Sequence, residues 1–271
     1  MRDVLRQILF RYLTRVLTKP LGSYVPAVDN DVDELRRHIR TGDVLLVCGE
    51  QRVSEIIKYL TQSSWSHAAI YVGDAPLRCF PEQRTSFERR FGDDAAHLLV
   101  EALIDEGVVI SPLSKYLSFP LRLCRPCGLI EPDRERVVQE ILGQLNYRYD
   151  LRNLLDLARY FLPISILPRR NRLAELEFGS GQTTEVICST VIARAFAAVD
   201  FPILPITENG SWPSRRPLAR HLRMRERPLG LITPRDFDLS PYFEVIKFNF
   251  IEGWKQAAET HERRYSQARQ S

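Results

Sequence analysis

The stretch SWSHAAIYVG, residues 64–73, predicts a core β-strand that begins with a histidine. Small and apolar residues follow His67, and because side chains alternate along a strand, Ala69 and Tyr71 share its face. A histidine at the start of a strand lies near the edge of the sheet, where solvent or substrate reaches it. Taken alone, a histidine at such a position is more often structural, bonded to a neighbouring backbone group, than catalytic.

A carboxylate interrupts a second apolar strand. Glu101 lies in the middle of LLVEALI, residues 98–104, where burial of a carboxylate is costly unless it is paired or hydrogen-bonded. If the two strands are neighbours, Glu101 can hold one imidazole nitrogen of His67 and leave the other nitrogen free to act as a base. The alternative is an ordinary surface carboxylate, because charged residues on half-buried strands usually face water.

A cysteine opens an apolar helix later in the chain. Cys188, in VICSTVIARAF, follows the polar loop GSGQTTE at residues 179–185. Unpaired N–H groups and the helix dipole at such a position favour a thiolate, and the same N–H groups can hold an oxyanion on an attacked carbonyl. The alternative is an inert, buried cysteine, since free cysteine is among the most buried residue types.

Composition narrows the class of protein. The 271 residues are 44% hydrophobic and 27% charged, which is typical of a globular chain and excludes disordered and collagen-like proteins. The formal net charge of +4 is too small to indicate nucleic-acid binding, so we expect no such partner, although contact with an anionic membrane stays open. Five unevenly spaced cysteines argue against a secreted disulfide framework and favour a reducing compartment.

The N-terminal segment, residues 1–24, mixes basic and apolar residues. Arg6, Arg11 and Arg15 interrupt its apolar runs before they reach the length of a signal core, and no stretch of about 18 apolar residues offers a membrane span. We therefore expect a cytoplasmic protein. On a helix, the apolar residues of this segment share one side, so the helix either packs on the domain or associates peripherally with a membrane.

The remaining pattern indicates one α+β domain with an antiparallel sheet flanked by helices. We expect an N-terminal helical extension over residues 1–35, the domain over 36–250 and a polar C-terminal helix over 251–271. Periodicity and capping residues predict strands within 41–49, 64–73, 98–104, 108–112 and 121–126, and helices within 29–39, 52–62, 133–145, 150–162 and 186–199. Residues 74–97 are interpreted as a polar excursion, and residues 232–248 as a loop and a closing strand.

Taken in chain order, three of these stretches resemble a known superfamily. SHAAIYVG, VEALIDEGVVI and VICSTVI are similar to NlpC-type cysteine hydrolases with a circularly permuted papain fold, in particular the YiiX/YebB-like group of lipo-like proteins. TGDVLLV, YRYDLRNLLDL and TPRDFDLSPYFEVI extend the similarity over roughly residues 40–250. The resemblance implies a permuted papain-like fold in which Cys188 is the nucleophile, His67 the general base and Glu101 the residue that orients it.

These features predict a cysteine hydrolase or acyltransferase that acts on an amide, ester or thioester without a cofactor or metal ion. The substrate would be a small molecule, a lipid or a peptide, and Trp65, Ser66 and Tyr71 are the candidate substrate-binding residues. A rival hypothesis from another class is a non-catalytic ligand- or lipid-binding module on the same fold.

Two further segments leave alternatives open. The CRPC sequence at residues 124–127 has the spacing of a redox or zinc motif, but no second ligand pair accompanies it and it ends a predicted strand. The arginine-rich segment 211–228 is either a solvated surface or part of a substrate mouth, and with the basic N-terminus it favours acyl-lipid or membrane-proximal substrates. His97 and His221 have no matching acid or nucleophile pattern.

Overall fold

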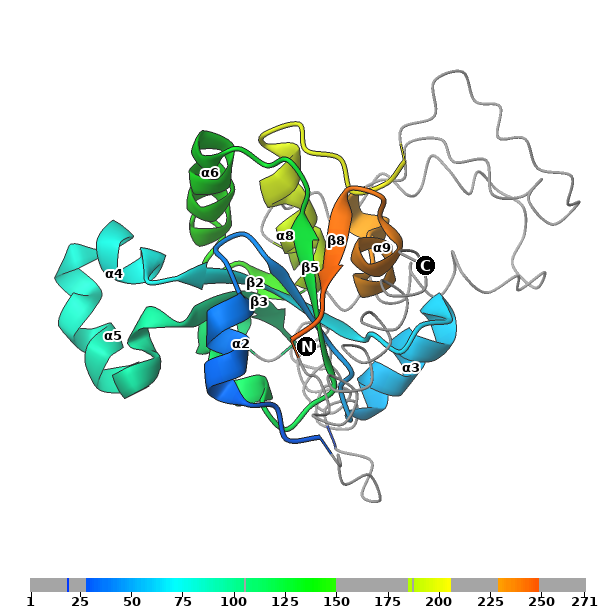
Figure 1. Cartoon of the computed structure of the whole chain (residues 1–271), viewed down its shortest axis with the longest axis horizontal. Coiled ribbons are helices and arrows are strands. Elements are labelled where there is room, and N and C mark those ends of the chain that lie inside the picture. Colours follow the sequence, from blue (N-terminus) through cyan, green and yellow to red (C-terminus); the bar gives the residue numbers. More distant parts are fainter. Residues whose placement is uncertain are drawn as a thin grey trace, which may run out of the picture.

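A six-stranded antiparallel sheet forms the centre of the protein (Figure 1). The structure, a computed structural model, describes residue 19 and residues 28–104, 106–149, 185–186, 188–205 and 229–248. The strand order is β4-β3-β2-β1-β5-β8, and every neighbouring pair is antiparallel. The strands are β1 (Val44–Val47), β2 (His67–Gly73), β3 (Leu98–Leu103), β4 (Gly107–Pro112), β5 (Leu121–Pro126) and β8 (Phe243–Ile246). The predicted α+β class with an antiparallel sheet is confirmed.

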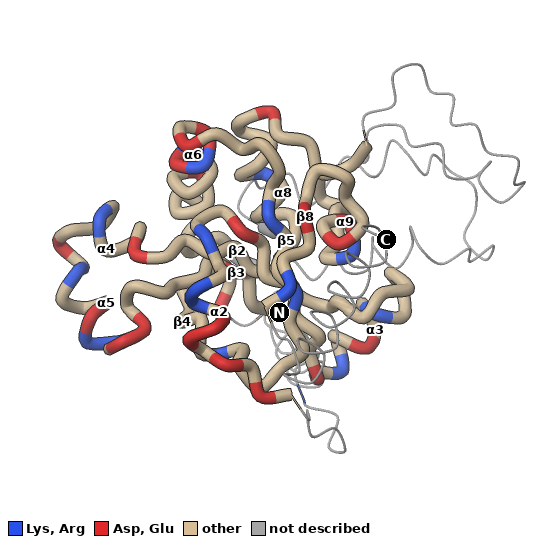
Figure 2. Tube along the Cα trace, in the orientation of Figure 1, with Lys and Arg blue, Asp and Glu red and all other residues tan. Residues whose placement is uncertain are grey.

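Helices and short turns surround this sheet. The α-helices are α2 (Val32–His38), α3 (Arg52–Thr61), α4 (Ala75–Cys79), α5 (Arg84–Phe91), α6 (Glu131–Leu142), α8 (Cys188–Ala197) and α9 (Pro234–Leu239). Single 3₁₀ turns are η1 (Pro81–Gln83), η2 (Gly92–Ala96), η3 (Leu113–Tyr116) and η5 (Leu229–Leu231). A separate pair of short parallel strands joins β6 (Arg148–Tyr149) to β7 (Glu185–Val186). Figure 2 shows that charged residues gather on the helices and turns, whereas the central strands are largely uncharged.

Alternation along β2 divides the interior into two cores. Ala68, Ile70 and Val72 belong to the larger core, which contains residues of α6 and α8. Ala69 and Tyr71 belong to the smaller core, which contains residues of α2, β3 and η3. The strand HAAIYV is therefore apolar on both faces because each face is covered, as its sequence predicted.

An arginine on the sheet, Arg125, holds the end of the first described helix through a hydrogen bond to its last carbonyl. Asp31 caps α2 by accepting hydrogen bonds from the N–H groups of Asp33 and Glu34, at 2.8 and 3.0 Å. Arg125 on β5 forms two hydrogen bonds with the buried carboxylate of Asp43, at 2.9 and 2.7 Å, and also donates to a carbonyl at the end of α2. The domain boundary predicted at residues 35/36 falls inside this helix, whose Leu35 is fully buried.

Two segments contain helices that their sequences did not predict. Residues 74–97 form α4, η1, α5 and η2, which project together beyond the end of β2 (Figure 1). The loop predicted before the closing strand contains α9, which begins with a capping box between Thr233 and Asp236. Both sets of helices are short, so too few residues repeat on one face for periodicity to reveal them.

Several predicted segments lie outside the described residues. They include most of the N-terminal extension, the helix predicted at 150–162, the arginine-rich segment 211–228 with His221, and the C-terminal helix at 251–271. Among the residues that the structure describes, no helix is both long and apolar enough to cross a membrane.

Candidate active site

The pairing of β2 with β3 brings His67 and Glu101 together. Ala69 lies directly opposite Glu101, so His67, two residues earlier on the same face, is its diagonal neighbour. Nε2 of His67 lies 2.7 Å from Oε2 of Glu101. The strands of His67 and Glu101 are therefore neighbours, as the predicted pairing of the two side chains required.

Glu101 is fully buried but has three side-chain partners. Lys115 donates from Nζ to Oε1 at 2.6 Å, and the hydroxyl of Tyr116 donates to Oε2, the oxygen that also bonds His67. Burial alone would raise the pKa of Glu101, but the hydrogen bonds and positive charges of His67 and Lys115 outweigh it and lower this pKa. Glu101 is therefore an ionised carboxylate in the interior and not a surface residue.

Cys188 reaches His67 from the other side of the sheet. It begins α8 and packs in the larger core, whereas Glu101 lies opposite a residue of the smaller core. The Cys188 thiol and the ring of His67 nevertheless interact, and this interaction raises the pKa of His67 and lowers the pKa of Cys188. His67 is the first residue of β2, and from this position its ring contacts Glu101 and interacts with Cys188.

The ring nitrogens of His67 have different partners. Because Nε2 faces Glu101, Nδ1 is the nitrogen left to exchange a proton with Cys188. Burial opposes a charged ring, yet hydrogen bonds and electrostatic attraction from Cys188 and Glu101 raise the pKa of His67 to about 9. A proton on this ring is thus retained at neutral pH.

The environment of Cys188 favours the thiolate. Burial would raise its pKa, but the hydrogen bond and charge of His67, together with the backbone N–H groups of Ala68 and Ser189, lower it. A thiolate beside an imidazolium is the form that attacks carbonyl carbon in cysteine-based nucleophilic catalysis. Backbone N–H groups at the start of a helix are also a type of donor that stabilises a developing oxyanion.

The three predicted substrate-binding residues have different surroundings. Trp65 lies beside a pocket, and its Nε1–H donates to Asp238 at 3.0 Å. Ser66 is buried, and its hydroxyl accepts the Gly49 N–H at 2.9 Å. The Tyr71 hydroxyl bonds Nδ1 of His97 at 2.8 Å, in the half of β2 that lies away from His67. For Ser66 and Tyr71 these are structural contacts, so substrate binding by them stays a prediction.

The other cysteines lack the environment of Cys188. All five are free; Cys79 and Cys127 are exposed, and Cys48 is partly buried. Burial raises the pKa of Cys124 to about 12, so the first cysteine of CRPC is held as a thiol. In the described part of the chain, no group of three or more His, Cys, Asp and Glu side chains is placed to hold a metal ion.

Sequence reasoning missed Lys115 and Tyr116. Both lie on η3, directly after β4, and they reach Glu101 because β4 pairs with β3. The sequence shows only a lysine and a tyrosine shortly after a predicted strand. Because such residues are common on protein surfaces, this pattern does not indicate that they bond a buried carboxylate.

The order of these elements defines a class of protein: a papain-like fold in permuted order, with the histidine on an early strand and the cysteine on a later helix. Residues 38–161 match the family described as permuted papain-like amidase enzymes, YaeF/YiiX, C92 family. This match confirms the predicted resemblance to the YiiX-like permuted papain family and supports hydrolase activity of the amidase type. His67 and Glu101 lie inside the matched range, and Cys188 lies beyond it.

Comparison with solved structures found a protein described as metalloprotein YiiX from Escherichia coli O157:H7. It aligns with a TM-score of 0.46 and 14% sequence identity, over 79% of this chain and 99% of that chain. No curated protein matches the sequence.

Proposed function

We propose that this protein is a papain-like cysteine hydrolase or acyltransferase in which Cys188, His67 and Glu101 act together on an amide, ester or thioester. One observation carries the proposal: His67 bonds a fully buried, ionised Glu101 at 2.7 Å and interacts with Cys188, whose pKa it lowers. A carboxylate is expensive to bury, and here it holds the histidine that interacts with the thiol.

The reaction proceeds in two steps. The Cys188 thiolate attacks the carbonyl carbon, an S–C bond forms, and N–H groups at the start of α8 stabilise the oxyanion. As the bond to the leaving amine, alcohol or thiol breaks, His67 gives its proton to the leaving group. His67 then takes a proton from the second acceptor as that acceptor attacks the thioester; the S–C bond breaks, the acyl group is released, and the Cys188 thiolate and protonated His67 are regenerated. Water as acceptor gives hydrolysis, and an amine or hydroxyl gives acyl transfer.

Cysteine labelling tests this site against an inert cysteine. If accessibility alone controlled alkylation, exposed Cys79 and Cys127 would react before buried Cys188. The proposal predicts the reverse order with iodoacetamide at pH 6.5, because ordinary thiols of pKa near 8.5 are then about 1% ionised. His67→Ala should abolish the preference for Cys188. Labelling of Cys188 no faster than Cys79 in the wild-type protein would contradict the proposed nucleophile.

Trapping the acyl group distinguishes the enzyme from a binding module. A panel of activated esters and thioesters, analysed by intact mass, should produce an acyl adduct on Cys188 that disappears with time in water. Faster loss of the adduct on addition of an amine would indicate transfer. An adduct that persists unchanged would favour the non-catalytic module.

Membrane-proximal or acyl-lipid substrates are part of the same proposal, supported by the basic and apolar sequence of residues 1–24. The chain without residues 1–21 should sediment less with vesicles of anionic phospholipid than the full chain does. Equal sedimentation of the two would contradict the membrane contact.

A further inference from the structure

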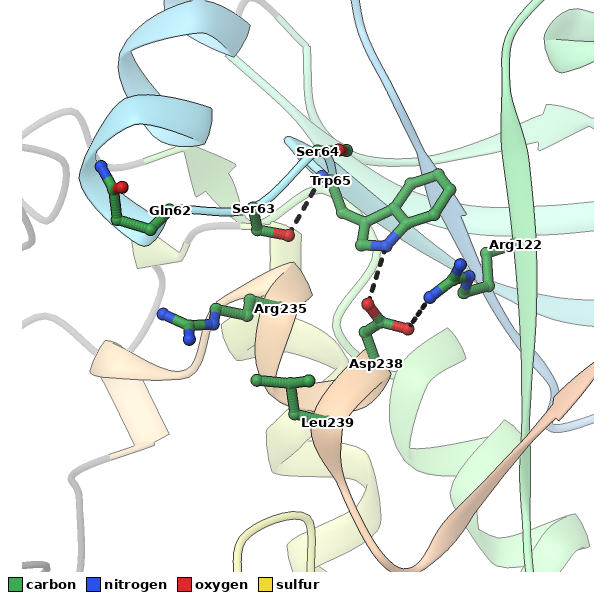
Figure 3. A pocket seen from close by; sticks show the side chains of 8 residues that line it. All are labelled: Gln62, Ser63, Ser64, Trp65, Arg122, Arg235, Asp238 and Leu239. Carbon is green, nitrogen blue, oxygen red and sulfur yellow. Dashed lines mark hydrogen bonds and ion pairs between the residues drawn. The ribbon is translucent and has the colours of Figure 1, made fainter.

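A polar pocket of about 260 Å³ lies beside Trp65 (Figure 3). Its walls come from the turn after α3, from β5 and from α9. The lining residues are Gln62, Ser63, Ser64, Trp65, Arg122, Arg235, Asp238 and Leu239. Neither the fold nor the series Cys188–His67–Glu101 requires such a pocket.

Two walls of the pocket are close in the chain to residues of the candidate active site. From Trp65 the chain reaches His67 in two residues, a span of about 7 Å in extended backbone. On the opposite wall, Arg235 comes three residues after Ile232, whose carbonyl accepts a hydrogen bond from the hydroxyl of Ser189. Ser189 directly follows Cys188. Two walls of the pocket are therefore connected, through a few residues of chain and one hydrogen bond, to the segments that carry His67 and Cys188.

One part of the pocket is electrically neutral and firmly held. Arg122 forms an ion pair with Asp238, whose second carboxylate oxygen accepts the indole N–H of Trp65 at 3.0 Å. The Arg122 guanidinium also lies 4.9 Å from the centre of the Trp65 ring, a cation–π contact. These three side chains use one another as partners, as Figure 3 shows, and they form a fixed wall.

Asp238 neutralises Arg122 but not Arg235. Nη1 of Arg235 donates to the Thr61 carbonyl at 2.8 Å, and Figure 3 shows its side chain turned away from Asp238. No carboxylate among the described residues lies within ion-pair distance of it, and a guanidinium has five N–H donors. With Arg122 balanced by Asp238, the pocket keeps one net positive charge.

We propose that this pocket is a subsite for a carboxylate group of the substrate, bound by Arg235. The proposal rests on the proposed function and names its substrate class: an amide, ester or thioester that also carries a carboxylate near the carbonyl that Cys188 attacks. A guanidinium fork matches the two oxygens of a carboxylate. One uncompensated charge fits a carboxylate better than a phosphate monoester, whose charge is about −1.5 to −2.

Two matched alkylating probes test this assignment on the full chain. Chloroacetyl-glycylglycine ends in a carboxylate, and chloroacetyl-glycylglycinamide is the same molecule with a neutral amide end. With each probe, the Cys188 thiolate forms an S–C bond and displaces chloride. The measurement is the ratio of the two second-order rates of Cys188 modification, read by peptide mass.

We expect the carboxylate probe to react about 3- to 10-fold faster with the wild-type protein. The ratio should fall to near one in Arg235→Gln and recover in part in Arg235→Lys, which keeps the charge but not the fork. Arg78→Gln is the matched control. This arginine is exposed on α4, pairs with Asp74 and lies beyond the opposite end of β2, so its removal should leave the ratio unchanged.

Each other outcome has a definite meaning. Equal rates with both probes in the wild-type protein, with Cys188 still the most reactive cysteine, would overturn the subsite and leave the proposed function standing. Slow modification of Cys188 by both probes would overturn the proposed function and the subsite with it. A faster reaction with a phosphonate probe of the same length would overturn the choice of carboxylate.

Discussion

Nε2 of His67 lies 2.7 Å from Oε2 of Glu101, a carboxylate that has no exposure to solvent. Lys115 and Tyr116 supply the remaining side-chain hydrogen bonds of this carboxylate. Because the partners of Glu101 come from both β2 and η3, the carboxylate has little freedom to turn. The ring that it bonds is consequently held with Nδ1 available to Cys188.

Replacement of Glu101 by glutamine should reduce the reactivity of Cys188. The variant keeps the shape of the side chain but removes its negative charge, so the pKa of His67 falls and the thiolate loses its partner. We expect iodoacetamide to modify Cys188 at least about tenfold more slowly at pH 6.5. Glu106→Gln, an exposed change in the adjoining hairpin turn, is the control and should react like the wild-type protein.

The pH dependence of alkylation should report the lowered pKa of Cys188. In the wild-type protein the rate should rise and level off well below the ordinary thiol range, since His67 and two backbone N–H groups stabilise the thiolate. In His67→Ala the same rise should move to higher pH. Coincident profiles for the two proteins would show that His67 does not stabilise the thiolate.

Stability should also depend on the protonation of His67. Its pKa in the folded protein, about 9, is above the ordinary value of 6.5. A raised pKa means that the folded state binds the proton more tightly than the unfolded state does. The stabilisation that protonated His67 gives the fold is therefore fully present below about pH 6.5, and it is lost as pH rises through about 9. The difference in urea unfolding free energy between wild-type and His67→Gln should therefore shrink from about pH 6.5 to about pH 9.5.

Removal of the Tyr116 hydroxyl should weaken the support of Glu101. Tyr116→Phe deletes a hydrogen bond to a buried carboxylate and should lower the free energy of unfolding by about 1–3 kcal/mol in urea titrations. Tyr59→Phe makes the same chemical change on a side chain that is 69% exposed, and it should stay within about 0.5 kcal/mol of the wild type. Equal effects of both changes would show that the Tyr116 bond contributes nothing.

Arg125→Met should destabilise the protein more strongly. The change leaves the Asp43 carboxylate buried without its cationic partner, which costs about 3–5 kcal/mol at pH 7. The loss should be smaller near pH 5, because burial already raises the pKa of Asp43 and its protonation removes the charge. Arg78→Met, which breaks an exposed ion pair, should cost less than about 1 kcal/mol by the same urea measurement.

The elements that could be predicted are those whose pattern is local. Alternation and apolar runs revealed β2 and β3. An acidic cap predicted the start of α2, and a polar loop before an apolar run predicted the helix that begins at Cys188. Residues 74–97 were missed because their helices are short and mostly exposed.

By itself the sequence determined which residue types could react: a histidine at the start of a strand, a carboxylate inside another and a cysteine before a helix. Only the tertiary structure decided that these three side chains meet, that Lys115 and Tyr116 stabilise the carboxylate, and that Arg122 pairs with Asp238 while Arg235 does not. The physical reason is that periodicity records the face on which a residue lies, whereas its partners depend on strand order and register. Arg122 and Asp238 are 116 residues apart in the chain, and packing of α9 against β1 and β8 brings their segments together.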